Sequence, residues 1–588
     1  MAAMQGLRNG RTPSSLRRLA FVVALFSASS LFAQQALSPQ APAPTSTMRA
    51  TTHLVLVDVV VHDKHGDHVT NLTANDFTIR DRGKPQTITV FSDDHAGGTV
   101  AKKTSPPPPL PPDVFTNRPE YHRPEGPPTI VLMDSLNTAV GDQLSAHAAM
   151  LQYLRTQSQN SQEIAILSLN ESLALLQDFT SDSRLLIAAL DKSNPNTSSE
   201  LSGMAIHTLT AIEAANLRPE TRRILDQQNQ TRAAESTDTR VRITLEALRS
   251  IARAVSGIPG RKNLIWVSSA FPFSLQPDIA NFPDAQRDYG EDIRHTASLL
   301  ASARVAFYTV DARGLMVGDV TERRLGTSIG ATVQTIQNSA NPRSPEDQLA
   351  NSPDAIIGSH ATMDDLAKET GGLAFYNNND IMQAVARSAA DGGRYYTLGY
   401  YPEGASWDGK FHNIEVKIAR NGVKPRYRSG YFAVDPAHTS ASDTPEQRDR
   451  RAYNELRAAL AAPLPATEVT FRLHVPVFAT GLRPQVQIQL LMDASTISFD
   501  SIESDLHHCN LDFMAAAVSS NGKVVASDAH TADVRLKPAQ FAQTNQGGLP
   551  FFMQLSLSPG TYSLRVAVRD NRTGLIGTLT VPLAVPAP

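Results

Sequence analysis

The sequence predicts a mixed fold in which a doubly wound, Rossmann-like α/β domain is flanked by β-sandwich units. In the middle of the chain, short apolar runs alternate with segments whose apolar residues recur at helical spacing, which is typical of a mostly parallel sheet covered by helices. On both sides of this region, apolar and polar residues alternate with a period of two between turn signals, which indicates antiparallel strands. A chain of 588 residues is long enough for several separate cores.

The first residues predict export. Arg17 and Arg18 precede an apolar run over 19–32 and a small residue, Ala33, so residues 1–33 are expected to be a signal peptide. An uncleaved N-terminal anchor is the alternative. Residues 34–51 are rich in Pro, Ala, Ser and Gln and predict a disordered tether. With no comparably long apolar run further on, no transmembrane span is expected after signal removal, and the chain is expected in the periplasm, secreted or at the cell surface.

The net charge and the cysteine content limit the kinds of partner and cross-link that are expected. The net charge of −3 gives no broad attraction for nucleic acid, so none is expected as a partner. Cys509 is the single cysteine, which rules out an intrachain disulfide. Cys509 follows His507 and His508, but neighbouring residues on a strand point to opposite faces, so a structural or surface cluster is expected here rather than a metal site.

Residues 52–94 predict a small β unit. Two alternating stretches flank a His-Gly-Asp turn, and a second turn falls at Arg82-Gly83-Lys84. Residues 95–128 include "SPPPPLPP" and predict a semi-rigid Pro-rich linker.

Residues 129–391 predict the α/β domain. It begins with the strand "TIVLMD", and the helix after this strand is expected to bury one face, made of Leu144, Ala148, Leu151 and Leu154. A hairpin follows, with its turn at Asn170-Glu171, and then a capped helix. A polar insertion, either helical or partly disordered, is expected from Ser193 to about Asp238. The remaining elements are a helix, the strand "KNLIWVSS", a helix ending near Ala303, the strand "RVAFYTVDA", a long loop, the helix "TMDDLAKETGG", the strand "LAFYN" and the helix "DIMQAVARSA". In the helix that precedes the strand "KNLIWVSS", apolar residues recur at helical spacing, namely Val241, Leu245, Leu248, Ile251 and Val255.

The rest of the chain predicts β structure. Residues 392–435 contain three strands, which are expected to pack with the N-terminal β unit because each part is too small to be stable alone. Residues 436–465 predict a linker with a short helix. Residues 466–588 predict about seven short strands in an immunoglobulin-like sandwich.

Together these segments resemble one family. The ordered set is "NLTANDFTIRDRGKPQTITVF", "IVLMDSLNT", "LQDFTSD", "GIPGRKNLIWVSSAFP", "FYTVDARGL", "LAKETGGLAFYN" and "YYTLGYYP", continuing to "RYRSGYF". It is similar to the von Willebrand factor type A-related proteins of acidobacteria, over about His53 to Val434. This resemblance implies a type A-like fold with a ligand site at the carboxyl edge of the sheet.

Metal-competent type A domains carry Asp-x-Ser-x-Ser after the first strand, a threonine from a second loop and an aspartate from a third. The resemblance places Asp134 at the first position and Thr138 at the last, whereas Leu136 replaces the middle serine. Ser268 and Ser269 stand where other members have Thr-Asp-Gly. Because Mg²⁺ binds weakly to sparse neutral oxygens, a degenerate metal-ion-dependent adhesion site is expected, with weak Mg²⁺ or Mn²⁺ at Asp134, Thr138 and Ser269.

Several alternatives stay open at this site. Thr239 and Thr244 are both candidates for the second-loop threonine. Asp311 is expected two strands away from Asp134, roughly 10 Å apart at normal strand spacing. Asp134 orders the turn as a helix N-cap, holds a cation weakly, or belongs to a complete metal site.

Two further motifs carry residues that are typical of catalytic or metal sites. "GTSIG" around Ser328, followed by Asp354 and His360, matches a hydrolase elbow, but no apolar strand precedes it, so a flexible loop is expected. His65 and His68 lie in a predicted hairpin turn, where a solvated turn is favoured over a metal site.

The sequence therefore predicts an exported, non-enzymatic binding or adhesion protein. It is expected to bind an unknown protein partner through the carboxyl edge of the α/β sheet, with Asn137, Ser268 and Asp311 at that edge. A structural or assembly role in the cell envelope and an exported serine hydrolase are the alternatives.

Overall fold

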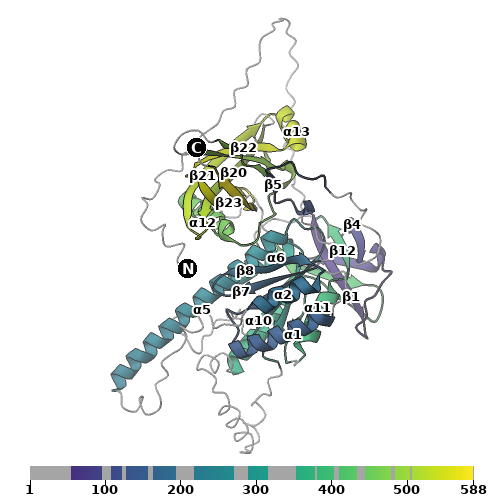
Figure 1. The fold of residues 1–588 in the computed structure, drawn as a ribbon. Helices are drawn as coiled ribbons and strands as arrows, with labels where there is room; N and C mark the ends of the chain where they lie inside the picture. Colours follow the sequence, from purple (N-terminus) through teal and green to yellow (C-terminus); the bar gives the residue numbers. More distant parts are fainter. Residues whose placement is uncertain are drawn as a thin grey trace, which may run out of the picture.

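The computed structural model describes most of the chain outside the N-terminal region (Figure 1). The described residues are 54–95, 107–121, 128–156, 163–193, 218–269, 289–314, 353–377, 380–402, 410–433, 444–478, 484–502 and 506–586. The expected signal peptide and tether, and the hydrolase motif at Ser328, lie outside them. The prediction of a mixed α/β and sheet-rich chain is confirmed.

The N-terminal strands and the strands after Gly392 together form two four-stranded sheets, and from here on the name N-terminal β unit covers both sheets. Their orders are β14-β1-β12-β4 and β15-β13-β2-β3. The strands are β1 (Val55–Asp63), β2 (Phe77–Asp81), β3 (Lys84–Gln86), β4 (Val90–His95), β12 (Arg394–Tyr400), β13 (Phe411–Ile418), β14 (Val423–Arg426) and β15 (Gly430–Phe432). β1 pairs antiparallel with β12, with Val57 opposite Leu398, and both side chains lie in the shared core.

The number of strands after Gly392 differs from the prediction. The segment predicted as one last strand forms two, β14 and β15, and these belong to different sheets. β14 pairs with β1, whereas β15 pairs with β13. The chain crosses from one sheet to the other between Arg426 and Gly430. The prediction of a single continuous strand here was therefore wrong.

The α/β domain has a six-stranded sheet in the order β11-β10-β9-β6-β7-β8. All neighbouring strands are parallel except β8, which runs antiparallel to β7. The strands are β6 (Thr129–Asp134), β7 (Ile164–Leu169), β8 (Leu173–Thr180), β9 (Lys262–Ser268), β10 (Val305–Asp311) and β11 (Ala374–Phe375).

Helices cover both faces of this sheet. One core contains Ile130, Leu132 and Trp266 and is closed by α5 (Pro219–Val255), α6 (Gly290–Ser302) and α10 (Pro353–Thr370). The opposite core contains Val131 and Val267 and is closed by α1 (Val140–Thr156), α2 (Ser183–Lys192) and α11 (Ile381–Asp391). Adjacent strand residues thus face opposite cores, as the period of two requires. The first half of α5 extends away from the sheet (Figure 1).

Two helices test the predicted buried faces. The five apolar residues expected on the inner face of α5 are all buried. On α1 the predicted face was right in part: Leu154 is buried and Leu151 packs against the core, whereas Leu144 is 56% exposed and Ala148 is exposed. The other buried positions are Gln143, Ala146, Met150 and Tyr153. The buried face packs Met150, Tyr153 and Leu154 into the core, and the polar Gln143 on this face donates its Nε2 to the backbone oxygen of Thr138.

The C-terminal unit has two five-stranded sheets whose inner faces share one core. One sheet has the order β17-β18-β16-β5, with β22 also paired to β18, and the other has the order β19-β20-β23-β24, with β21 also paired to β20. The strands are β5 (Val114–Thr116), β16 (Phe471–His474), β17 (Val477–Phe478), β18 (Gln485–Met492), β19 (Asp500–Ile502), β20 (Leu506–Ser519), β21 (Val524–Leu536), β22 (Leu549–Ser556), β23 (Gly560–Asp570) and β24 (Ile576–Val585). The assignment of this unit to the immunoglobulin-like type of sandwich stays a prediction.

Two predicted linkers contribute ordered structure instead. The stretch expected to be only a Pro-rich spacer supplies β5, which pairs with β16, and the buried Asn117 side chain donates to the backbone oxygens of Ala466 and Val469. The helix expected to be short is α12 (Pro445–Ala461), with 17 residues and a capping box at Thr444. Its buried Leu456 and Leu460 pack against the C-terminal sheet, which stabilises the longer helix.

Polar contacts join the three units. Arg304, which follows α6, donates to Asp58 of β1 and to Thr397 of β12. The backbone N–H of Gly257, after α5, donates to Thr467 near the start of the C-terminal unit at 2.9 Å. Of the helices that the structure describes, none is long and apolar enough to cross a membrane.

Candidate functional site

The carboxyl end of β6 holds a buried carboxylate that accepts four hydrogen bonds. Asp134 Oδ1 accepts the backbone N–H of Asn137, while Oδ2 accepts the Asn137 side-chain amide, Trp266 Nε1 and the Ser268 hydroxyl, all at 2.9 Å. Asp134 is 3% exposed. The bond to the Asn137 backbone closes the turn after the strand. The expected helix N-cap is wrong, because α1 begins only at Val140 and Asp134 lies six residues before it.

Leu136 explains why this loop departs from the metal-binding pattern. Its side chain is fully buried in the core beneath α5, alongside Leu132 and Trp266. A serine at this position would face the hydrophobic core of this protein, where an unpaired hydroxyl is costly. Leu136 therefore anchors the loop in the core and offers no ligand to a metal.

Asn137 connects this loop to helix α5. Its side-chain amide nitrogen donates to Asp134 and also to the Thr244 hydroxyl, at 3.0 Å. Thr244 is fully buried. Thr239, the other candidate from the sequence, donates its hydroxyl back to Glu235 of its own helix. The structure thus places Thr244 in the network and Thr239 outside it.

Thr138 and Ser269 connect the loops after β6 and β9. The backbone N–H of Ser269 donates to Thr138 Oγ1 at 3.2 Å, and the backbone N–H of Ala139 donates to Ser269 Oγ at 3.3 Å. The Thr138 hydroxyl lies 3.4 Å from Ser268 Oγ. All three polar residues are buried, so they hold the two loops together from within.

The donors around Asp134 compete with a cation. Burial raises the pKa of Asp134, against the opposing effect of the hydrogen bonds from Asn137, Ser268 and Trp266. A hard cation needs lone pairs on oxygen, and in this arrangement four N–H and O–H donors already point at the one carboxylate of the loop. The residues present therefore do not fit a hydrated Mg²⁺ ion as they are placed, which argues against the weak Mg²⁺ or Mn²⁺ binding that the sequence predicts at Asp134, Thr138 and Ser269.

Asp311 lies at the same edge but in a second network. It stands opposite Ser268 in the sheet register, with β9 between its strand and β6. Its carboxylate accepts three bonds from the Arg313 guanidinium and lies 3.0 Å from His360 Nε2. Burial opposes ionisation, but these two partners outweigh it and lower the pKa of Asp311.

Asn137, Ser268 and Asp311 were expected to line the ligand-binding edge. All three are buried, with exposures of 2%, 0% and 2%, so they support the loops beneath the surface in this structure. Their direct contact with a partner stays a prediction. His360, a residue of the hydrolase motif, contacts Asp311 and stacks on Tyr376, with ring centroids 4.2 Å apart.

The histidine and cysteine motif of the C-terminal unit lies along β20, where its side chains diverge. Cys509 is buried in the core, and burial raises the pKa of its thiol to about 12. His508 contacts Asp500 and Asp533 through its two ring nitrogens, and His507 stacks on Phe541. The three residues thus make separate contacts.

Sequence reasoning missed Trp266 as a member of the site. The indole N–H reaches Asp134 because the tryptophan lies on the strand next to β6, two residues before Ser268. A buried indole usually has a hydrogen-bond partner, so a tryptophan in an apolar strand that ends beside a conspicuous aspartate is the signal that could have found it.

Comparisons with known proteins add resemblances of fold only. No protein-family profile and no curated protein sequence matches the chain. Among solved structures, the chain is similar to an aerotolerance-related membrane protein from Bacteroides fragilis, at 10% identity over 45% of this chain and 99% of that one, with a TM-score of 0.22. It is also similar to a von Willebrand factor type A protein from Catenulispora acidiphila, at 7% identity over 57% and 73% of the two chains, with a TM-score of 0.22.

A third similar structure contains the three N-terminal domains of the type V pili tip protein Mfa5 from Porphyromonas gingivalis. The identity is 10%, the match covers 85% of this chain and 99% of that chain, and the TM-score is 0.25. Scores this low carry no argument about what this chain does.

Proposed function

We propose that this chain is an exported, non-enzymatic binding protein of the type A-like class, which binds a protein partner at the carboxyl edge of the six-stranded sheet. The sheet order supports this proposal most strongly. β6 lies between β7 and β9, so the chain leaves β6 on one side and returns on its other side. In open α/β sheets, ligands bind outside the carboxyl ends of the strands at such a switch point.

The start of α1 gives this edge an apolar surface. Val140 is 36% exposed and Leu144 is 56% exposed. These two residues are four apart on the same helix, so their side chains are neighbours. Exposed apolar side chains beside a ligand-binding edge suit a protein partner better than a small polar ligand.

The buried network beneath this surface supports a metal-independent mode of binding. Asp134, Asn137 and Thr244 tie the first loop to α5, and Ser269 ties it to β9. A loop fixed in this way loses little conformational entropy when a partner docks, which favours affinity. We therefore propose that the degenerate adhesion site acts as a support for the surface formed by Val140 and Leu144.

Site-specific photo-cross-linking tests the partner surface. A photoreactive residue at position 144 of the full chain should give adducts in the exported fraction of the native organism, and excess unlabelled protein should compete with them. The matched control is position 185 on α2, where Leu185 is 50% exposed. The adducts should survive EDTA and disappear in a Leu144→Arg variant probed from position 140. Identical adducts from positions 144 and 185 would sink the proposal.

A separate titration tests the metal. Isothermal titration of the full chain with Mg²⁺ or Mn²⁺ should give no saturable heat that depends on Asp134. Saturable binding that is lost in Asp134→Ala would show a working metal site and would replace the metal-independent mode.

A structural role in the cell envelope is the second candidate. It is favoured by the contacts that fasten the three units to one another, such as Arg304 with Asp58 and Gly257 with Thr467. Fractionation separates the two: a scaffold should stay with the envelope in stoichiometric complexes, whereas a free binding protein should be found in the soluble exported fraction.

A further inference from the structure

A second polar cluster lies at the junction between the N-terminal β unit and the α/β domain. Among the residues that the structure describes, His62, His68 and Asp391 bring one ligand atom each within 4.8 Å of one another. His62 belongs to β1, and Asp391 is the last residue of α11. The sequence pointed to His65 and His68 in this turn, but His65 is exposed outside the cluster, so His62 is the correct partner.

The hairpin turn places the two histidines face to face. Asp63 Oδ1 accepts the backbone N–H groups of His65 and Asp67, and Gly66 has a φ of +90°. This tight turn brings His62 and His68 into a cross-strand pair with ring centroids 4.4 Å apart. Their imidazoles therefore share one side of the hairpin.

Asp391 offers one carboxylate oxygen to this pair. Its Oδ2 accepts the Tyr308 hydroxyl and pairs with Arg426. Its Oδ1 lies 3.5 Å from His62 Nε2. Ligands of a tetrahedral zinc ion, at about 2.0–2.1 Å from the metal, lie about 3.3 Å apart. The contact between Asp391 and His62 already has this spacing, and the support from Tyr308 and Arg426 is the kind that orients ligating carboxylates.

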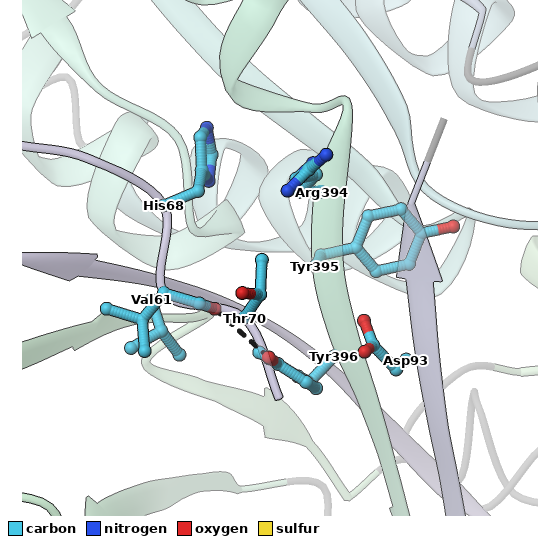
Figure 2. Close-up of a pocket in the computed structure, with 8 residues that line it drawn as sticks. Val61, His68, Thr70, Asp93, Arg394, Tyr395 and Tyr396 are labelled. Carbon is cyan, nitrogen blue, oxygen red and sulfur yellow. Dashed lines mark hydrogen bonds between the residues drawn. The ribbon is translucent and has the colours of Figure 1, made fainter. Parts of the chain in front are cut away.

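His68 carries an unsatisfied group in this cluster. Its Nδ1 is buried and has no hydrogen-bond partner among the described residues. Figure 2 shows His68 and Arg394 above a hollow that Thr70, Asp93 and Tyr396 also line.

We propose that His62, His68 and Asp391 bind a transition-metal dication, with Zn²⁺ as the best match for two imidazoles and one carboxylate. Water completes the shell. The ion joins the turn after β1 to the end of α11 and so fastens the N-terminal β unit to the α/β domain. This site is separate from the carboxyl edge proposed above, and neither proposal depends on the other.

Zinc titration of the full chain tests this site. After dialysis against EDTA and removal of the chelator, competition with a zinc-responsive dye should reveal one Zn²⁺ per chain with a Kd of about 1 µM or tighter. His62→Ala and His68→Ala should each weaken this binding at least tenfold. Both side chains are only partly buried, so these variants are better tests than changes at Asp391, which also holds Tyr308 and Arg426.

Two matched controls identify the site. His65→Ala changes a histidine of the same turn, and His508→Ala removes a histidine that contacts Asp500 and Asp533 in the C-terminal unit. Both should leave zinc binding unchanged. Zinc should also raise the Tm of the wild type but not of His62→Ala, because a ligand bound only by the folded state stabilises it. Absence of a micromolar site, or a site lost in His508→Ala and kept in His62→Ala, would overturn the proposal.

Discussion

Replacing Asp134 by alanine tests whether the carboxylate is a structural acceptor or a metal ligand. The substitution removes the acceptor of four hydrogen bonds at the carboxyl end of β6. If the role is structural, the protein loses stability without any metal present. If the role is metal binding, the apo-protein changes little, and only metal-dependent stabilisation is lost.

The expected loss follows from the partners. A hydrogen bond to a charged group contributes about 1.5–3 kcal/mol. Two of the four donors keep a second contact, since the Asn137 amide also reaches Thr244 and Ser268 lies near Thr138. The other two bonds, from Trp266 and the Asn137 backbone, set a range of about 3–6 kcal/mol. We expect about 3 kcal/mol, because the variant no longer buries a carboxylate whose pKa is raised by burial.

Urea unfolding followed by tryptophan emission measures this loss. The chain has two tryptophans, and a Trp407→Phe background leaves Trp266, which is fully buried beside the site. The matched control is Asp178→Ala, an exposed aspartate on β8 of the same sheet, which should cost less than about 0.5 kcal/mol. A loss for Asp134→Ala no larger than that of the control would refute the structural role.

Three further predictions concern buried groups. Burial and Asp365 raise the pKa of Glu369 to about 7. Between pH 4.5 and pH 7 the folded state keeps this proton while the unfolded state releases it, so the stability of the wild type falls as the pH rises. Glu369→Gln should therefore be about 2 kcal/mol more stable than the wild type at pH 8 but not at pH 4. Burial lowers the pKa of Lys262 to about 7, so the unfolded state binds more protons above pH 7, and urea unfolding should show stability rising towards pH 10 in wild type but not in Lys262→Met. Gly372→Ala should cost about 3 kcal/mol in thermal unfolding, because the new Cβ would lie 1.9 Å from the Phe307 carbonyl oxygen, whereas Gly141→Ala, with open space in α1, should be neutral or stabilising.

The sequence located the buried elements well where the local pattern was strong. The run "TIVLMD" gave the bounds of β6, and the apolar spacing in α5 gave its buried face. For α1 the same reasoning placed Leu154 correctly but put the exposed Leu144 on the buried face. The helix has apolar residues on more than one side, and its packing against the sheet buries the side of Met150, Tyr153 and Leu154, where Gln143 is hydrogen-bonded to the preceding loop.

Contacts between distant segments could not be predicted from local patterns. β5 looked like part of a Pro-rich spacer because three residues give no usable period, and only its pairing with β16 makes it a strand. The cluster of His62, His68 and Asp391 likewise depends on a hairpin and on a helix end more than three hundred residues away. The sequence showed one of these histidines but gave no sign of Asp391.

The amino-acid sequence by itself determined the central strands and helices of the α/β domain, and that Asp134 ends a buried strand, because hydrophobic periodicity and turn residues act over a few neighbours. The tertiary structure decided what surrounds that aspartate. Trp266, Thr244 and Ser268 reach the loop from other elements, and burial among these donors favours a structural acceptor over a metal ligand. Hydrogen bonding and desolvation depend on atoms brought together in space, so the chemistry of the site was fixed only when the chain was folded.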